Sequence, residues 1–266
     1  MTRLRGVLRA AQGWLPQRHD HLVILAYHLV GGGTDSPVDI PIDRFETHLD
    51  ELAQHSRVVA LEEELGKLAA ASDRGVEARP RVAITFDDAY DNFREVVWPR
   101  LVERSLPATL FVPVGFVEGE CGPPITGTGG LPPISWAALR EIVGSGLVVV
   151  GSHSWTHPDL RRVPGEHLRR ELLQSRDTLA ERLDRPVRGF CYPRGLWNRS
   201  IEREVAAVYQ YAVIGGGRAV TRRNLRPHRL WRTPIRRDGP SSLRPLLTAR
   251  IWVEELLADP VRRFRG

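Results

Sequence analysis

Two pairs of side chains in this sequence have the types and spacing that a catalytic metal site requires. Asp87 and Asp88 directly follow one apolar run, and His153 and His157 follow another. One aspartate and two histidines make a three-ligand set that leaves a coordination position open for water. The second aspartate is then free to take a proton from that water. The pattern therefore predicts a metal-dependent hydrolase.

Each pair also has a purely structural interpretation. Asp88 or Asp91 could cap a following helix, but that explains two adjacent carboxylates poorly, because neighbouring carboxylates repel unless a cation or proton intervenes. Four-residue spacing places His153 and His157 on one face of a helical turn. Such a pair is often incidental by itself. Combined with the aspartate pair at another strand end, it favours a metal site.

The segments that carry these residues are similar to those of a known family. TFDD at 85–88 and SHSWTHPDL at 152–160 resemble the first two motifs of the polysaccharide deacetylase family, the group with the NodB homology domain (carbohydrate esterase family 4). FCYPRG at 190–195 resembles the third motif. LAYH at 25–28 resembles the first strand of branches that act on poly-N-acetylglucosamine-type polymers. The resemblance spans roughly residues 22–235.

The resemblance implies a distorted (β/α)7 barrel with one divalent metal ion, commonly zinc. It implies that the metal ligands are Asp88, His153 and His157, with Asp87 as the general base. It also implies that the oxyanion of the reaction rests on the metal and on the backbone N–H of Arg194. The residues that we expect to contact the substrate are His28, Tyr192 and Arg194.

The third motif departs from the family pattern at two positions. Cys191 stands where many members have an arginine that orients the base, and Arg194 stands where tyrosine is common. Arg194 could recognise a carboxylate or phosphate of the substrate, or supply the charge that Cys191 lacks. His228 is the nearest candidate for the late general acid of the family, but it precedes a strand, and we expect a surface histidine. Arg232 is a further candidate without an assigned role.

The order of apolar runs and helical patterns predicts an α/β fold. Alternation of strand and helix favours a parallel sheet, and about seven repeats favour a single closed barrel over an open sheet. Polar residues stand where the runs stop, as at the active face of a barrel enzyme. The expected strands are 22–27, 58–61, 81–86, 109–114, 147–152, 187–192, 211–214 and 230–235.

Helix boundaries are also predicted. Asp43 and Ser135 are expected N-caps of two helices. The strongest helical pattern covers 166–183. The segment 116–133, rich in Gly and Pro, is expected to be a functional or mobile loop.

Length and composition are those of one globular domain with extensions. The 266 residues, 42% hydrophobic and 26% charged, suffice for one barrel. We divide the chain into a basic amphipathic N-terminal segment (1–20), the barrel (21–240), and a C-terminal helix and tail (241–266). The first segment lacks a secretory signal and could lie on an anionic membrane or pack on the barrel. We therefore expect a cytoplasmic protein, with peripheral membrane contact left open.

The net charge of +6 comes almost wholly from arginine, since Lys67 is the sole lysine. We expect no nucleic-acid partner, because no basic stretch is interleaved with stacking aromatics. The two cysteines, Cys121 and Cys191, offer no disulfide framework.

The leading hypothesis is a hydrolase that removes acetyl groups from N-acetylated sugars or glycan precursors, with O-acetylated sugars left open. One alternative is an amidase or deformylase acting on a non-sugar amide. Another is a non-catalytic glycan-binding barrel, against which Asp87 argues because binding needs no free base. The oligomeric state is not predicted.

Overall fold

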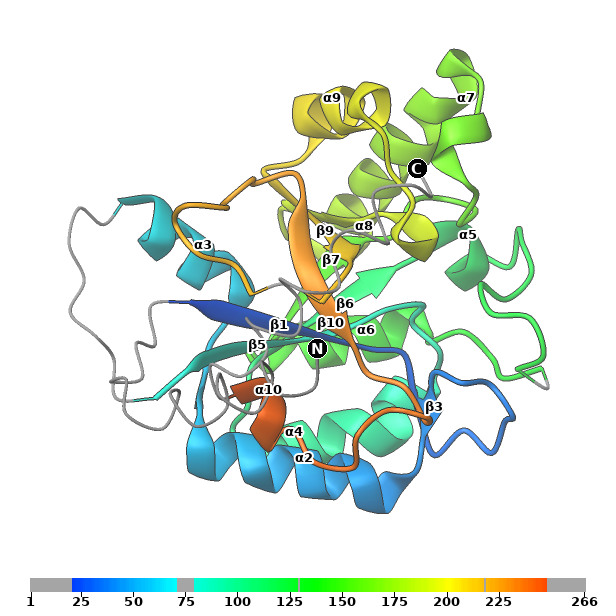
Figure 1. Cartoon of the computed structure of the whole chain (residues 1–266). Coiled ribbons are helices and arrows are strands. Elements are labelled where there is room, and N and C mark those ends of the chain that lie inside the picture. The colour runs from blue at the N-terminus through cyan, green and yellow to red at the C-terminus, as the bar shows by residue number, and fades with distance from the viewer. Residues whose placement is uncertain (1–20, 71–78, 129, 218, 248–266) are drawn as a thin grey trace, which may run out of the picture.

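Seven parallel strands close into a barrel in the computed structural model (Figure 1), which describes residues 21–70, 79–128, 130–217 and 219–247. The predicted single distorted (β/α)7 barrel is thereby confirmed. Helices cover its outside, as expected for parallel strands joined by crossovers. The barrel strands are β1 (Leu22–Tyr27), β5 (Arg81–Phe86), β6 (Ala108–Val112), β7 (Val148–Ser152), β8 (Gly189–Cys191), β9 (Tyr211–Gly215) and β10 (Leu230–Pro234).

The barrel closes where β1 pairs with β5 on one side and with β10 on the other. Pairing between β1 and β5 is long, from Leu22 opposite Arg81 to Tyr27 opposite Phe86. Pairing between β7 and β8 is reduced to Ser152 opposite Phe190. The short strand β4 (Arg57–Val58) shares one edge of β5 with β6. These unequal ladders make the barrel distorted.

Alternate residues of the strands enter two separate cores, as a period of two requires. Leu22 and Ile24 face the barrel interior, where they belong to the same apolar cluster as Phe111. Val23 and Leu25 pack outward with helix residues such as Phe45. The strands are therefore buried on both faces, which explains their nearly continuous apolar runs.

The remaining elements are mostly helices, and several carry short π-helical or 3-10 turns. They are β2 (Leu29–Val30), β3 (Asp39–Ile40), α2 (Ile42–His55), α3 (Leu61–Ala70), η1 (Phe93–Val97), α4 (Trp98–Glu103), α5 (Val114–Val117), α6 (Trp136–Gly144), η2 (Leu160–Arg162), α7 (Gly165–Arg169), η3 (Arg170–Gln174), α8 (Ser175–Leu183), η4 (Pro193–Gly195), α9 (Arg199–Val208) and α10 (Arg244–Leu247).

Of three predicted element boundaries, one is confirmed and two differ from the structure. Ser135 caps α6 as predicted, since its side chain accepts the N–H of Ala138. The prediction for Asp43 was wrong: Pro41 holds the N-cap position of α2, and Asp43 lies in the first turn. The predicted strand 58–61 ends at Val58, and Leu61 already begins α3.

Parts of the predicted extensions lie outside the described residues. The N-terminal segment 1–20 and the residues after 247 belong to this part. Within the described residues, the predicted C-terminal segment holds α10. Among the described helices, none combines the length and apolar character that crossing a bilayer demands.

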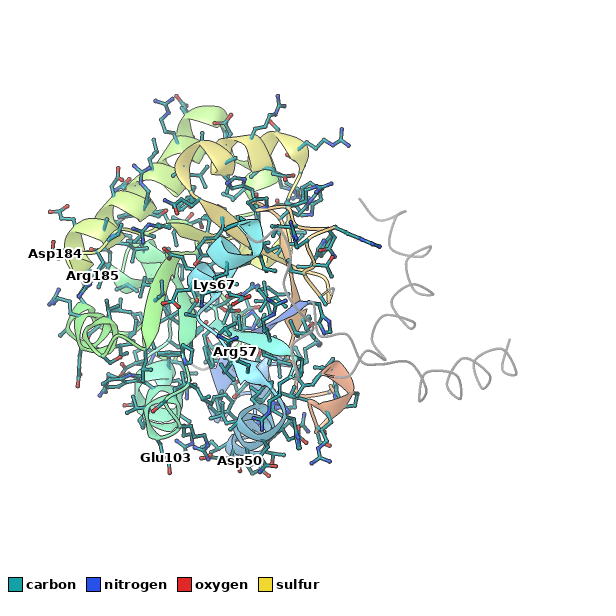
Figure 2. All side chains as sticks on the ribbon, turned by 90° about the vertical axis from the view of Figure 1, so that its left-hand side faces the viewer. Asp50, Arg57, Lys67, Glu103, Asp184 and Arg185 are labelled. Carbon is teal, nitrogen blue, oxygen red and sulfur yellow. The ribbon has the colours of Figure 1, made fainter. Side chains whose placement is uncertain are left out.

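Charged side chains of both signs project from the surface that faces the viewer in Figure 2. Among those labelled there, Asp50 and Glu103 both bind Arg104, at 3.1 and 2.9 Å. Arg104 also contacts Glu46 at 2.7 Å. Exposed pairs of this kind contribute little stability each, about 0–1 kcal/mol. They do show that part of the arginine surplus is neutralised locally.

Candidate active site

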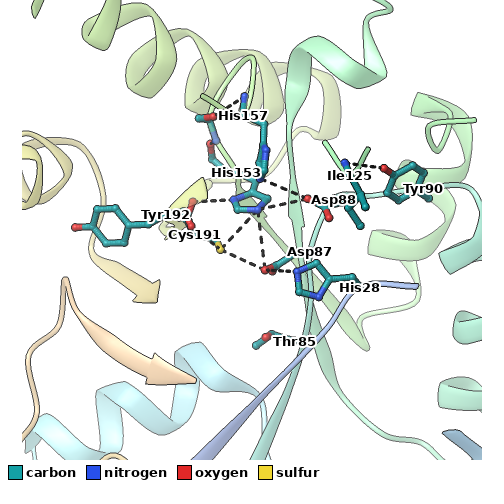
Figure 3. A network of polar contacts seen from close by, with 12 residues as sticks. His28, Thr85, Asp87, Asp88, Tyr90, Ile125, His153, His157, Cys191 and Tyr192 are labelled. Atoms are coloured by element: carbon teal, nitrogen blue, oxygen red, sulfur yellow. Dashed lines mark hydrogen bonds and ion pairs between the residues drawn. The ribbon is translucent and has the colours of Figure 1, made fainter. Parts of the chain in front are cut away.

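The two predicted pairs converge at the C-terminal ends of the strands (Figure 3). Asp87 and Asp88 leave the end of β5, and His153 leaves the end of β7. The Nε2 atom of His153 lies 3.5 Å from Oδ1 of Asp88. The Nε2 atom of His157 lies 3.7 Å from that same oxygen. Residues 65 positions or more apart in sequence thus form one cluster of buried polar side chains.

The backbone takes unusual conformations to present these side chains. Asp88 has a positive φ of 74°, and Ala89 follows at 50°. Ser154 and His157 also lie in the left-handed region, at 68° and 56°. Left-handed backbone is costly for residues other than glycine and gathers at functional sites. The chain therefore bends sharply at both strand ends, which brings the side chains inward.

The donor atoms of Asp88, His153 and His157 fit a divalent cation. One atom from each lies within 4.8 Å of the other two. Among the described residues, Oδ1 of Asp88 has no hydrogen-bond partner although it is fully buried. The Nδ1 of His153 lies 2.8 Å from the carbonyl oxygen of Cys191. Because a carbonyl only accepts, Nδ1 carries the proton and Nε2 keeps its lone pair for a ligand bond.

The charges of the protein alone leave this donor set uncompensated. Burial, and then the neighbouring Asp87, raises the pKa of Asp88 well above its usual range. Burial lowers the pKa of His153 and of His157, and for His157 the proximity of His153 adds to this effect. A carboxyl that resists ionisation beside two neutral imidazoles is the electrostatic arrangement that a bound cation would relieve.

Asp87 is held by Arg232, which extends from β10. The two terminal nitrogens of the guanidinium donate to the two carboxylate oxygens, each at 2.7 Å. Both side chains are almost wholly buried, with exposed fractions of 4% and 3%. Burial alone would raise the pKa of Asp87, but the guanidinium outweighs it and holds this pKa well below its usual range. Asp87 is therefore an ionised carboxylate with a fixed orientation.

Arg232 reaches two further groups of the same cluster. Nη1 also donates to Oγ1 of Thr85 at 2.9 Å, and Nη2 lies 3.0 Å from Sγ of Cys191. Cys191 is itself buried, with its sulfur 3.5 Å from Oδ2 of Asp87. The resemblance implies an arginine at the position of Cys191, and in this structure Arg232, from β10, contacts both Cys191 and Asp87.

His28 lies on the opposite side of Asp87 from the histidine pair (Figure 3). Its Nε2 is 3.7 Å from Oδ2 of Asp87, and its side chain is 22% exposed. Burial lowers the pKa of His28 to about 4, although the negative charge of Asp87 opposes this. A neutral, partly exposed imidazole at this place can contact a substrate that reaches the cluster.

The other two predicted substrate contacts differ in position. Tyr192 points away from the cluster (Figure 3), and its hydroxyl donates to the backbone carbonyl of His228 at 3.0 Å. The structure does not bring Tyr192 into the site. Arg194 is exposed, has a φ of 58°, and its charge contributes to the lowered pKa of His157. Arg194 therefore lies near the histidine side of the cluster.

His228 is distant from the cluster, as its place before β10 indicated. Its Nε2 is 3.0 Å from the carbonyl oxygen of Tyr209, at the N-terminal end of β9. The predicted loop 116–133 does approach the site. Tyr90, two residues after Asp88, accepts the N–H of Ile125 in this loop and pairs with Pro133.

Comparison with known proteins agrees with this geometry. The sequence model of the family described as polysaccharide deacetylase matches residues 74–214, more than half of the chain. The chain belongs to the polysaccharide deacetylase family. Family membership supports a hydrolase that acts on acetylated polysaccharides. No protein with a curated description matches the sequence significantly.

Several solved structures share the fold. A deacetylase PplD from Streptococcus pyogenes in complex with acetate is 21% identical, with a TM-score of 0.70, covering 90% of this chain and 97% of that one. IcaB from Ammonifex degensii is 26% identical, with a TM-score of 0.68 and coverage of 82% and 93%. The putative polysaccharide deacetylase BA0330 from Bacillus anthracis is 19% identical, with a TM-score of 0.69 and coverage of 83% and 66%.

Proposed function

We propose that this chain is a divalent-metal-dependent deacetylase that removes acetyl groups from N-acetylated sugars of a glycan. The observation that carries the proposal is the convergence of an Asp-His-His donor set with a separate, ionised aspartate. Asp88, His153 and His157 would hold the cation. Zinc suits one carboxylate and two imidazoles with an open position.

A bound cation would supply Lewis-acid polarisation of the amide carbonyl and a more acidic water. The protein supplies the rest. Asp87 accepts the proton of the attacking water, and Arg232 keeps this carboxylate ionised and aimed. His153 is oriented by its bond to the Cys191 carbonyl. Because the cluster is buried apart from His28, these charges act at low dielectric, which strengthens them.

The proposal of a sugar amide rests on family membership and on the chemistry of the site. An amide is a poor electrophile, and a cation that polarises its carbonyl together with a base that activates water can overcome this. Asp88, His153 and His157 would hold the cation, and Asp87 would be the base. Arg194 at the rim would favour a substrate that carries a carboxylate or phosphate near the acetyl group. His28 would contact the sugar from the Asp87 side.

The test is acetate release from a panel of N-acetylated and O-acetylated sugars, with zinc content measured on the same protein. We expect zinc-dependent release from an N-acetylated sugar. Release from non-sugar amides alone would show an amidase of another kind. Zinc binding without release from any acetylated compound would leave a binding protein and refute the proposal.

A further inference from the structure

The segment 153–157, here called the histidine loop, holds both imidazoles and is strained. Ser154 and His157 have positive φ values of 68° and 56°. Such residues persist only when their surroundings enforce the conformation. The two residues between them, Trp155 and Thr156, are therefore the points at which a restraint would fix the geometry of both imidazoles.

One buried carboxylate binds both of these residues. Oε2 of Glu171 accepts the backbone N–H of Trp155 at 2.8 Å and that of Thr156 at 2.9 Å. Oε1 of Glu171 accepts the hydroxyl of Thr156 at 2.6 Å. Glu171 is only 7% exposed. Charge-assisted bonds to successive N–H groups of this kind are short and strong.

The helical turn that carries Glu171 is itself anchored to the barrel. Glu171 lies in the π-helical turn η3, and π-helical turns occur frequently at functional sites. The hydroxyl of Ser175 donates to the carbonyl of Glu171 at 2.6 Å and contacts the hydroxyl of Ser152 at 2.9 Å. Since Ser152 ends β7, the helix is tied to the strand from which the histidine loop departs.

The opposite side of the loop is closed by a tight backbone contact. The N–H of Gly115 donates to the carbonyl of Trp155 at 2.8 Å. A Cβ at Gly115 would lie 2.8 Å from that oxygen, so a larger residue does not fit. Gly115 and Glu171 thus hold the Trp155 peptide units from opposite ends.

We propose that Glu171 is a positioning residue that preforms the metal site by fixing the histidine loop. This inference rests on the proposed function, since it concerns the same metal. Without the carboxylate, the buried N–H of Trp155 and the part-buried N–H of Thr156 lose their acceptor, and the loop relaxes from its left-handed turns. The imidazoles of His153 and His157 would then converge only when the cation itself orders them. The free-energy cost of ordering the loop would then be subtracted from the free energy of zinc binding, so the zinc affinity would fall.

The test compares Glu171→Met with Glu171→Gln, using zinc alone as the probe and chelator competition to measure its Kd. Methionine keeps the length but accepts none of the three bonds. Glutamine can accept both N–H groups at its carbonyl and donate to the Thr156 hydroxyl. We expect Glu171→Met to weaken zinc binding about 10–100-fold, the range for lost support of metal ligands. We expect Glu171→Gln to stay close to wild type.

Glu64→Met is the matched control. Glu64 is another buried carboxylate, 1% exposed, and it binds Arg81 at 2.7 Å. Arg81 begins β5, whose far end carries the aspartates, so this control lies at the other end of the barrel. We expect Glu64→Met to lower thermal stability but to leave the zinc Kd unchanged.

Thr156→Val provides a milder variant that keeps the fold, because Thr156 is exposed and loses only one bond. We expect a smaller weakening of zinc binding in the same direction. A wild-type zinc Kd in both Thr156→Val and folded Glu171→Met would overturn the role of Glu171 while leaving the proposed function intact. Absence of zinc binding in the wild-type protein would overturn the metal site itself.

Discussion

Arg232 and Asp87 form a bidentate ion pair across the barrel interior, with both contacts at 2.7 Å. The two residues come from strands 145 positions apart in sequence. Their pairing fixes the plane of the Asp87 carboxylate and places a guanidinium beside it, although position 191 holds a cysteine.

Replacing Arg232 with methionine should lower kcat sharply while zinc binding survives. Asp87 would lose its orientation and its counter-charge, and a misplaced reacting group costs on the order of 100-fold in rate. The measurement is steady-state acetate release together with zinc content. Unchanged kcat in Arg232→Met would show that the ion pair is only structural.

The double variant Cys191→Arg, Arg232→Ala tests whether the arginine beside Asp87 can come from β8 in place of β10. Sγ of Cys191 lies 3.0 Å from Nη2 of Arg232, so an arginine at position 191 could extend into the vacated space. We expect this variant to recover part of the rate lost in Arg232→Ala. The single variant Cys191→Ala is its control, because it removes the thiol while Arg232 stays in place. Equal rates in the double variant and in Arg232→Ala would show that an arginine at position 191 cannot act in place of Arg232.

Substitutions of the two adjacent aspartates should have different effects, one on the rate and the other on zinc binding. Asp87→Asn should retain zinc and lose about 10²–10⁴-fold in kcat, the usual contribution of a general base. Asp88→Asn should lose zinc, because Oδ1 of Asp88 is the oxygen that faces both imidazoles. Each variant is the control for the other, since both change one buried carboxylate to an amide. Full acetate release by Asp87→Asn would refute its assignment as base.

The sequence predicted the barrel, and it pointed to the side chains that the structure brings together as a possible metal site, because both depend on local patterns. Apolar runs that end in Asp87, Asp88 and His153 indicate strands and their carboxyl ends together. Arg232 could not be placed, since only the tertiary structure shows that β10 and β5 flank the same strand, β1, and so bring Arg232 within reach of Asp87. One signal was present: a charged residue inside the apolar strand 230–234 needs a buried partner.

Other differences also have a tertiary cause. The motif predicted a substrate contact for Tyr192, but alternation along β8 and the following turn directs its ring away from the cluster. Glu171 lies inside the strongest helical pattern of the sequence, where a charged residue is expected to face solvent. Its spacing of three from Leu168 and of four from Ser175 places it on the buried face, but only the tertiary structure shows that the histidine loop supplies its partners.

His28 should affect substrate binding without affecting zinc. Its imidazole is partly exposed beside Asp87. Among the described residues, two groups of side chains could hold a metal ion, Asp88-His153-His157 and Asp87-His153-Cys191, and His28 belongs to neither. We expect His28→Ala to lower kcat/KM for acetylated sugars while the zinc Kd stays at the wild-type value. A lost zinc site in this variant would instead make His28 part of the metal cluster.

His48 should make the stability of the barrel depend on pH. It is fully buried in α2, with Nδ1 3.2 Å from the hydroxyl of Tyr27, and burial lowers its pKa although Glu51 opposes this. The unfolded chain then binds more protons than the folded one below the ordinary histidine pKa of about 6.5. The contribution of His48 to stability is therefore present at neutral pH and is lost as pH falls.

Urea unfolding between about pH 7.5 and pH 5, on either side of the unperturbed histidine pKa, measures this effect. The free energy of unfolding should fall less steeply with acidification in His48→Gln than in the wild-type protein, because glutamine does not titrate and can still bond to Tyr27. His167→Gln, at an exposed position on α7, controls for the loss of a histidine as such. Parallel pH profiles for His48→Gln and the wild type would mean that the imidazole is accommodated equally well in its charged form.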